Sequence, residues 1–215
     1  MPQGAKLTSS YFRRSMDKAF EGLDSCILPP FYDDITIKSG TFSGHLHNTR
    51  AVLQRIRDCG FTLNALKCFF FQTKINYLGH VIENGKISLD PERVKKIVSF
   101  PVPHNVKALR RFTGMAQFCS RFVENFNTRL APLYALTKKN VPFTWSDSCQ
   151  EAFEYVKRKL TSYPVLQSPR TTDTFILETD ASDWGIGGCL KGKRQNGDEY
   201  VVSYYSAKLQ DAEYR

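Results

Sequence analysis

The segment Phe31-Tyr32-Asp33-Asp34-Ile35-Thr36-Ile37 places two adjacent carboxylates inside an apolar, β-branched run. The run favours an extended hairpin, and two neighbouring negative charges within it are costly unless a positive group is held there. A divalent metal is one such group, because carboxylates can hold two Mg²⁺ ions roughly 3.5–4 Å apart for nucleotidyl transfer. A solvated turn is the alternative, since Asp-Asp pairs are common in loops. The pair alone leaves both interpretations open.

The composition predicts a folded, basic chain. Its 215 residues are 41% hydrophobic and 24% charged, which suffices for one large or two small cores and argues against disorder. Thirty Lys and Arg residues against 21 Asp and Glu residues give a formal net charge of +9. This excess favours a polyanionic partner. Nucleic acid is favoured over a membrane, because no long apolar run or basic amphipathic anchor stands out.

Cysteine and histidine usage points to neither a disulfide framework nor a structural metal. The six cysteines are scattered and contain no C-x-x-C pair, which predicts reduced thiols in buried helices or strands. His45 and His47 share one short segment, but no cysteine or carboxylate lies at ligand spacing, so both are expected to be structural. No secretory signal pattern stands out, and an intracellular location is expected.

Periodic apolar residues predict a series of amphipathic helices. Hydrophobic side chains at three- and four-residue steps indicate helices over 7–23 and 45–59, the second ending at Gly60. Asp90 followed by Pro91 is typical of an N-cap with proline at the first helical position. Further helices are expected over residues 92–99, 106–118 and 148–160.

Strands are expected in two regions. The first is a hairpin of aromatic and alternating runs at 68–71 and 75–82, around the polar residues 72–74. The second is a three-stranded antiparallel sheet with strands at 174–179, ending in Asp180, and at 185–190 and 200–205. Together with the helices, these strands predict an α+β fold.

Several short blocks of the chain are distinctive when they are taken together and in order. Before the acidic pair stand Met1-Pro2-Gln3-Gly4-Ala5-Lys6 and Tyr11-Phe12-Arg13-Arg14-Ser15-Met16-Asp17. After it come Gly60-Phe61-Thr62-Leu63-Asn64, Tyr77-Leu78-Gly79-His80-Val81-Ile82, Leu109-Arg110-Arg111-Phe112-Thr113-Gly114, Phe143-Thr144-Trp145 and Glu178-Thr179-Asp180-Ala181-Ser182. In combination, these blocks resemble the reverse transcriptase region of gypsy-type LTR retrotransposon polyproteins. The resemblance covers essentially the whole chain.

The resemblance implies four regions. Residues 1–90 correspond to the C-terminal part of a polymerase palm, with a YxDD-like hairpin and a primer-grip-like hairpin. Residues 91–144 correspond to a helical thumb, 145–169 to a connection helix, and 170–215 to the N-terminal part of an RNase H-like domain. The implied reaction of the parent protein is RNA-directed DNA synthesis by two-metal nucleotidyl transfer, together with RNase H activity. Mg²⁺ or Mn²⁺ is the implied cofactor.

The same resemblance implies the site residues. Asp33, Asp34 and Asp180 are the expected catalytic and metal-binding carboxylates. The expected partner is a primer-template, as RNA/DNA hybrid or duplex, held in the thumb largely through its phosphates. A solvated charged face is the alternative for the thumb, and a plain strand role is the alternative for His80. The expected nucleic-acid contacts are Gln3, Gly4, Leu78, Gly79, His80, Lys107, Arg110 and Arg111.

The chain also departs from the family pattern. The first metal-binding aspartate of the family belongs to a block that precedes Met1, and the remaining RNase H carboxylates would follow Arg215. Both metal sites are therefore expected to be incomplete. Pro29-Pro30 replaces strand formers, and the two missing backbone donors are expected to distort the acidic hairpin. We expect no catalysis by this chain alone, and a non-catalytic nucleic-acid-binding or interaction protein is the alternative function.

Overall fold

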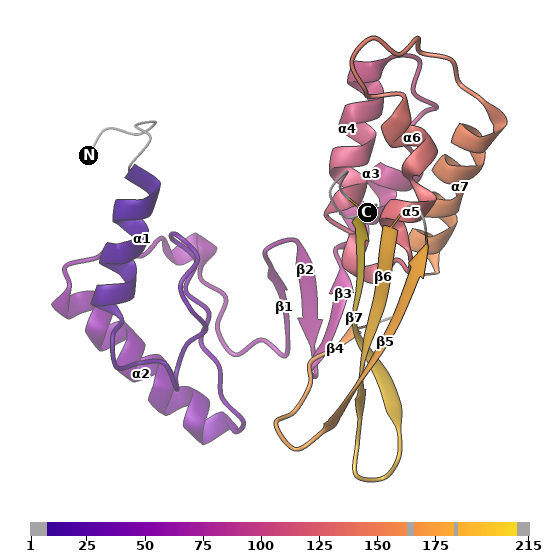
Figure 1. Ribbon diagram of the computed structural model, residues 1–215. Helices are drawn as coiled ribbons and strands as arrows, with labels where there is room; N and C mark the ends of the chain where they lie inside the picture. Colours follow the sequence, from indigo (N-terminus) through magenta and orange to yellow (C-terminus); the bar gives the residue numbers. More distant parts are fainter. Residues whose placement is uncertain (1–7, 163–165, 183–184, 210–215) are drawn as a thin grey trace. The chain divides into compact units, whose positions relative to one another are not determined.

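The computed structural model describes residues 8–162, 166–182 and 185–209. The chain divides into two compact units, Met1–Gln72 and Thr73–Arg215, called unit 1 and unit 2 (Figure 1). Helices and antiparallel sheets occur in separate stretches of the chain, which confirms the predicted α+β class. Within the described residues, every helix is too short or too polar to cross a membrane.

Unit 1 is built on helices α1 (Thr8–Ala19) and α2 (Phe42–Asp58). Thr41 sets the start of α2, because its hydroxyl oxygen accepts a hydrogen bond from the Gly44 N–H at 3.1 Å. Gly60 follows the helix with φ +70, the left-handed conformation typical of a C-terminal glycine. Both predicted helices are confirmed, with α1 ending earlier and α2 starting earlier than expected. The small core of this unit contains Met16, Phe20, Cys26, Ile27, Val52 and Ile56.

Unit 2 contains two antiparallel sheets. The first has the strand order β1-β2-β3-β4 and the second the order β5-β6-β7. The strands of the first sheet are β1 (Lys74–Tyr77), β2 (His80–Glu83), β3 (Lys86–Leu89) and β4 (Leu166–Gln167). Those of the second are β5 (Thr174–Ser182), β6 (Gly185–Lys193) and β7 (Glu199–Lys208). The second sheet confirms the three predicted C-terminal strands and extends each of them.

The position of the turn in the first predicted hairpin was wrong. Residues 68–71 lie outside any strand, and the chain reverses at Leu78 and Gly79 instead of at 72–74. Leu78 has φ +49 and Gly79 has φ +77, the pair of left-handed conformations that a two-residue type I′ turn requires. The alternating pattern concealed this turn, because leucine is seldom left-handed. Residues 86–89, to which no strand was assigned, form β3.

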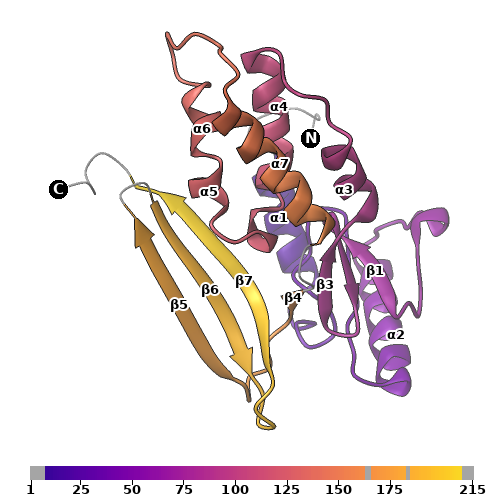
Figure 2. The same cartoon turned by 90° about the vertical axis from the view of Figure 1, so that its right-hand side faces the viewer.

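The helices of unit 2 are α3 (Pro91–Val98), α4 (Val106–Gln117), α5 (Phe126–Arg129), α6 (Ala131–Ala135) and α7 (Asp147–Thr161), with a short 3₁₀ turn η2 (Ser120–Phe122). The predicted N-cap is confirmed: the Asp90 carboxylate accepts a hydrogen bond from the Glu92 N–H at 3.0 Å, and Pro91 follows it. Figure 2 shows the helices gathered in one group, with the sheet β5-β6-β7 beside α5 and β3 leading into α3.

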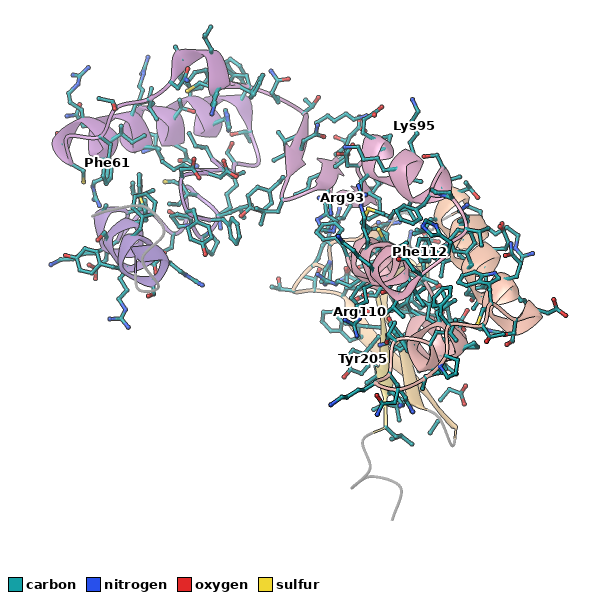
Figure 3. The ribbon with its side chains drawn as sticks, turned by 90° about the horizontal axis from the view of Figure 1, so that it is seen from above. Phe61, Arg93, Lys95, Arg110, Phe112 and Tyr205 are labelled. Atoms are coloured by element: carbon teal, nitrogen blue, oxygen red, sulfur yellow. The ribbon has the colours of Figure 1, made fainter. Side chains whose placement is uncertain are left out.

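The core of unit 2 is centred on aromatic rings from different helices. Phe112 of α4 is fully buried, and its ring centroid lies 4.6 Å from that of Phe153 of α7. Phe100 approaches Phe112 from the α3 side at 5.7 Å. Leu89 of β3 and Leu166 of β4 are buried in the same cluster, so the first sheet shares this core. Figure 3 shows Phe112 inside the unit.

Cysteines and histidines take ordinary structural roles. All six cysteines are free, and three of them (Cys26, Cys119 and Cys149) are buried as predicted, whereas Cys59 is exposed and the other two are partly exposed. Burial raises the pKa of the Cys119 thiol to about 11. His45 is half-buried and hydrogen-bonded through Nδ1 to the Ser39 hydroxyl at 2.7 Å, while His47 is exposed.

Replacing Leu78 by asparagine is expected to stabilise the chain by about 0.5–1 kcal/mol, because asparagine tolerates the left-handed conformation that leucine avoids. The matched control is the next turn, where Asn84 already occupies the same position with φ +51. Asn84→Leu should therefore destabilise the chain. Urea unfolding measures both changes, and a loss of stability in Leu78→Asn would show that the leucine side chain contributes packing that outweighs its backbone strain.

Candidate nucleic-acid interface

The acidic pair lies at a tight turn of unit 1. Phe31 and Asp34 exchange two backbone hydrogen bonds, at 3.2 and 3.0 Å, so that Tyr32 and Asp33 form the turn itself. Both carboxylates are exposed. Among the residues that the structure describes, no three His, Cys, Asp or Glu side chains are grouped closely enough to hold a metal ion. Metal binding at Asp33 and Asp34 therefore stays a prediction.

The strand that should carry the acidic pair is interrupted. The hairpin has separate bridges at Phe31–Asp34 and at Ile27–Ile37, with three residues between them on one side and two on the other. Pro29 and Pro30 occupy the longer side, and neither has an N–H to donate to a ladder. The local backbone thus has the kind of distortion that the two prolines predict.

Asp180 lies within β5, opposite Gly187 of β6, and its side chain is exposed. The strand continues beyond it to Ser182, so the residue is not at the strand end as expected. Glu178 shares the same face of the strand by its two-residue spacing, but it forms an ion pair with Lys191. Its hydrogen bond to Lys191 raises the pKa of that ammonium group. The metal-binding role of Asp180 also stays a prediction.

The turn between β1 and β2 packs against α4 and η2. The His80 ring lies 4.9 Å from the ring of Phe118 and 5.8 Å from that of Phe122. Burial lowers the pKa of His80, and the charges of Arg121 and Arg93 lower it further, although a hydrogen bond with the Leu78 backbone acts in the opposite direction. His80 is therefore held as a neutral ring near pH 7.

Arg93 of α3 packs against this turn, although it lies outside the sheet. Its guanidinium carbon lies 3.8 Å from the centroid of the Phe118 ring, in a cation–π contact. A Cβ atom on Gly79 would come within 2.8 Å of Arg93 Nη2 and 3.0 Å of Phe118 Cζ. Glycine is thus required both for its positive φ and for this close approach. Leu78, Gly79 and His80 form this turn and the start of β2, and their contact with nucleic acid stays a prediction.

Arg93, which contacts this turn, was not among the candidate residues expected from the sequence. A signal was available, because Arg93 lies four residues before the buried Ile97 and helical spacing places both on one side of α3. Helical spacing thus indicates that Arg93 faces inward. It does not indicate the contact with the turn, because the turn belongs to a different element.

Three predicted contact residues share one side of α4. Lys107, Arg110 and Arg111 are exposed and follow helical spacing of three and four residues. Arg110 has a structural role as well, because its Nη2 donates a hydrogen bond to the Thr137 carbonyl at 3.0 Å. The Arg111 guanidinium lies 6.0 Å from the Phe100 ring. We call these three residues the α4 basic face.

Figure 3 shows Arg110 on the outside of α4 and Lys95 directed away from the helices. Gln3 and Gly4, the remaining predicted contacts, lie outside the described residues.

Two family models match the chain. Residues 1–82 match "Reverse transcriptase (RNA-dependent DNA polymerase)", and residues 145–215 match "RNase H-like domain found in reverse transcriptase". The Pol polyprotein of transposon 412 from Drosophila melanogaster is 32% identical over 96% of this chain and 17% of its own length. The Pol polyprotein of feline endogenous virus ECE1 is 32% identical over 97% of this chain and 20% of its own. The transposon Tf2-3 polyprotein of Schizosaccharomyces pombe is 30% identical over 99% of this chain and 16% of its own length.

Solved structures agree on the fold. A foamy viral protease-reverse transcriptase in complex with RNA/DNA hybrid superposes with a TM-score of 0.83 at 22% identity, covering 100% of this chain and 29% of that one. The same enzyme in complex with double-stranded DNA gives a TM-score of 0.83, with 44% of that chain covered.

The chain belongs to the reverse transcriptase and RNase H region of retrotransposon and retroviral Pol polyproteins. Its matches to transposon 412 and Tf2 place it with the gypsy-type elements. It spans 16 to 20% of the length of these curated relatives.

The stability of the chain is expected to fall as the pH drops below about 6.5, the ordinary pKa of histidine. The unfolded chain then takes up a proton at His80 that the folded chain, with its lowered pKa, does not bind. The loss should continue until the pH passes the folded pKa and then level off. His80→Phe should flatten this part of the profile. Urea unfolding between pH 7.5 and 5 measures it, and equal pH dependence in both proteins would contradict the assignment.

Proposed function

We propose that this chain binds RNA/DNA hybrid or duplex nucleic acid through the phosphates, as part of an RNA-directed DNA polymerase and RNase H polyprotein acting inside the cell. The observation that carries the proposal is the α4 basic face. Among the described residues, no carboxylate lies within ion-pair distance of Lys107, Arg110 or Arg111. Three clustered positive charges without counterions attract a polyanion.

Further support comes from the position of the β1–β2 turn and from the comparisons. His80 contacts Phe118, which directly follows α4, so the turn and the α4 basic face are attached to one rigid core. The two solved relatives are complexes with RNA/DNA hybrid and with double-stranded DNA. Contacts to phosphates, which every sequence presents, predict binding with weak sequence preference.

For catalysis, we propose that the parent polyprotein carries out two-metal nucleotidyl transfer and that this chain alone does not. Reverse transcriptases as a family use divalent metals, and Asp33, Asp34 and Asp180 are the residues proposed to ligate them. A two-metal site needs more oxygen ligands than one pair of carboxylates supplies. The exposed turn at Asp33 and Asp34 and the lone Asp180 therefore do not fit a complete site within the described residues.

A non-catalytic nucleic-acid-binding or interaction protein derived from a retroelement is the second candidate. The broken hairpin below Asp33 and Asp34 favours it, because a distorted strand aims these carboxylates poorly. The two candidates share the binding surface and differ only in catalysis.

Replacing Lys107, Arg110 and Arg111 by alanine should weaken binding to all duplex sequences alike. Each phosphate contact removed should also reduce the slope of log K against log salt by about 0.7–0.9. Fluorescence anisotropy with a labelled hybrid at several salt concentrations measures both effects. The control removes the same charge from the second sheet, with Lys191, Lys193 and Lys208 replaced by alanine. If both triple variants lost affinity equally, total charge and not the α4 basic face would explain the binding.

Purified residues 1–215 should neither extend a primer on an RNA template nor cleave an RNA/DNA hybrid, with Mg²⁺ or Mn²⁺. Gel-based extension and cleavage assays test this. The controls are the double variant Asp33→Asn/Asp34→Asn for extension and Asp180→Asn for cleavage. Activity in the unchanged chain that disappears in the matching control would overturn the assignment of this chain as inactive.

A further inference from the structure

Arg93 is a preorganised cation without a counterion. Its side chain is half-buried, and its guanidinium lies over the Phe118 ring, 2.8 Å from where a Cβ atom on Gly79 would stand. In the described part of the chain, no carboxylate lies within ion-pair distance of it. A guanidinium whose face is already stacked keeps its N–H edge free to donate and loses little conformational entropy when an anion binds.

A shallow depression opens beside this guanidinium, between α3 and α4. It is lined by Asp90, Arg93, Lys96, Ile97 and Met115. Two of these side chains are positive and one is negative. The Asp90 carboxylate already accepts the N–H of Glu92 as the helix cap. The depression, called here the α3 depression, therefore has a net positive charge and an apolar floor.

The surroundings add to this positive potential. His80 also contacts the Phe118 ring, and the positive charges of Arg93 and Arg121 both lower the pKa of His80. Arg121 itself donates to the Ser203 hydroxyl at 3.4 Å, which is a neutral partner. Cys119, the other titratable group near Arg93, is buried and neutral at pH 7 because its pKa is raised to about 11. An oxyanion at this position would relieve repulsion among several cationic groups.

We propose that Arg93 and Lys96 form a binding site for one phosphate group at the α3 depression. This inference rests on the proposed function, because the phosphate is taken to belong to the backbone of the bound nucleic acid. The site lies next to the β1–β2 turn, since the Asp90 N–H donates to the Gly79 carbonyl at 3.4 Å. It thus extends the phosphate-binding surface from α4 across to α3. Arg93 donates from its guanidinium edge, and Lys96 provides a second charge from the following turn of the helix.

The main test compares three single variants by the salt dependence of hybrid binding. Because Arg93 and Lys96 share one phosphate, Arg93→Gln and Lys96→Gln should each reduce the slope of log K against log salt, by up to the value of about 0.7–0.9 that one lost phosphate contact gives. Lys95→Gln is the matched control: it removes the same charge from the same helix, at a position that is exposed and absent from the α3 depression. Equal slopes for the three variants would overturn the proposal.

Arg93 also packs against the turn, so its replacement can affect folding. Melting temperatures of all variants detect such an effect. If Arg93→Gln does not fold, Lys96→Gln still tests the proposal, because Lys96 is exposed. Arg93→Lys provides a further distinction. Because lysine keeps the charge but lacks the planar fork, it should retain the salt slope while weakening binding. A complete retention of affinity in Arg93→Lys together with an unchanged slope in Lys96→Gln would contradict the site.

A titration with inorganic phosphate tests the phosphate site independently of the proposed function. Phosphate added to the intact chain should shift the NMR signals of the Arg93 Nε–H and the His80 ring, whereas chloride at equal ionic strength should not. If the chain failed to bind hybrid but showed these shifts, the proposed function would fail and the phosphate site would stand. If it bound hybrid without any change in these signals from either hybrid or phosphate, the site would fail and the proposed function would stand.

Discussion

The contact between the Phe112 and Phe153 rings holds the helices of unit 2 together, and the proposed nucleic-acid-binding surface depends on it. Phe112 is fully buried, 4.6 Å from Phe153 and 5.7 Å from Phe100, so it fixes which side of α4 faces inward. Helical periodicity then leaves Lys107 and its neighbours on the outside. The core and the α4 basic face are therefore two consequences of one pattern. A substitution that rotated α4 about its axis would therefore disrupt the core and the α4 basic face together.

The same core also positions the β1–β2 turn. Phe118 lies just beyond α4 and contacts both the His80 ring and the Arg93 guanidinium. Three elements that are separate in sequence thus meet at one aromatic ring, and the left-handed backbone of Leu78 and Gly79 is kept in place by that contact. Strained backbone of this kind persists only where the surrounding structure holds it. The proposed binding surface is for this reason expected to be rigid.

The sequence predicted what local signals encode. Helices α3, α4 and α7 were placed within two residues, because caps such as Asp90 coincide with apolar periodicity. The Leu78–Gly79 turn was misplaced, because leucine gives no turn signal and because Arg93, which packs close to Gly79, lies fourteen residues after that glycine. The residues of the α4 basic face were expected from the resemblance to a polymerase thumb, whereas the α3 depression was not expected, since it requires side chains from two helices. Metal ligation at Asp33 and Asp34 depends on partners distant in sequence, which local patterns do not specify.

Hydroxyl-radical footprinting of the intact chain, with and without an RNA/DNA hybrid, tests most directly whether nucleic acid lies on the surface formed by the turn and the helices. The account predicts that Leu78, His80 and Met115 lose reactivity on binding, because they lie at the turn and in the α3 depression. Phe175 and Leu177, which are 51% and 67% exposed on β5, should keep theirs. Protection of Phe175 and Leu177 without protection at the turn would contradict the account.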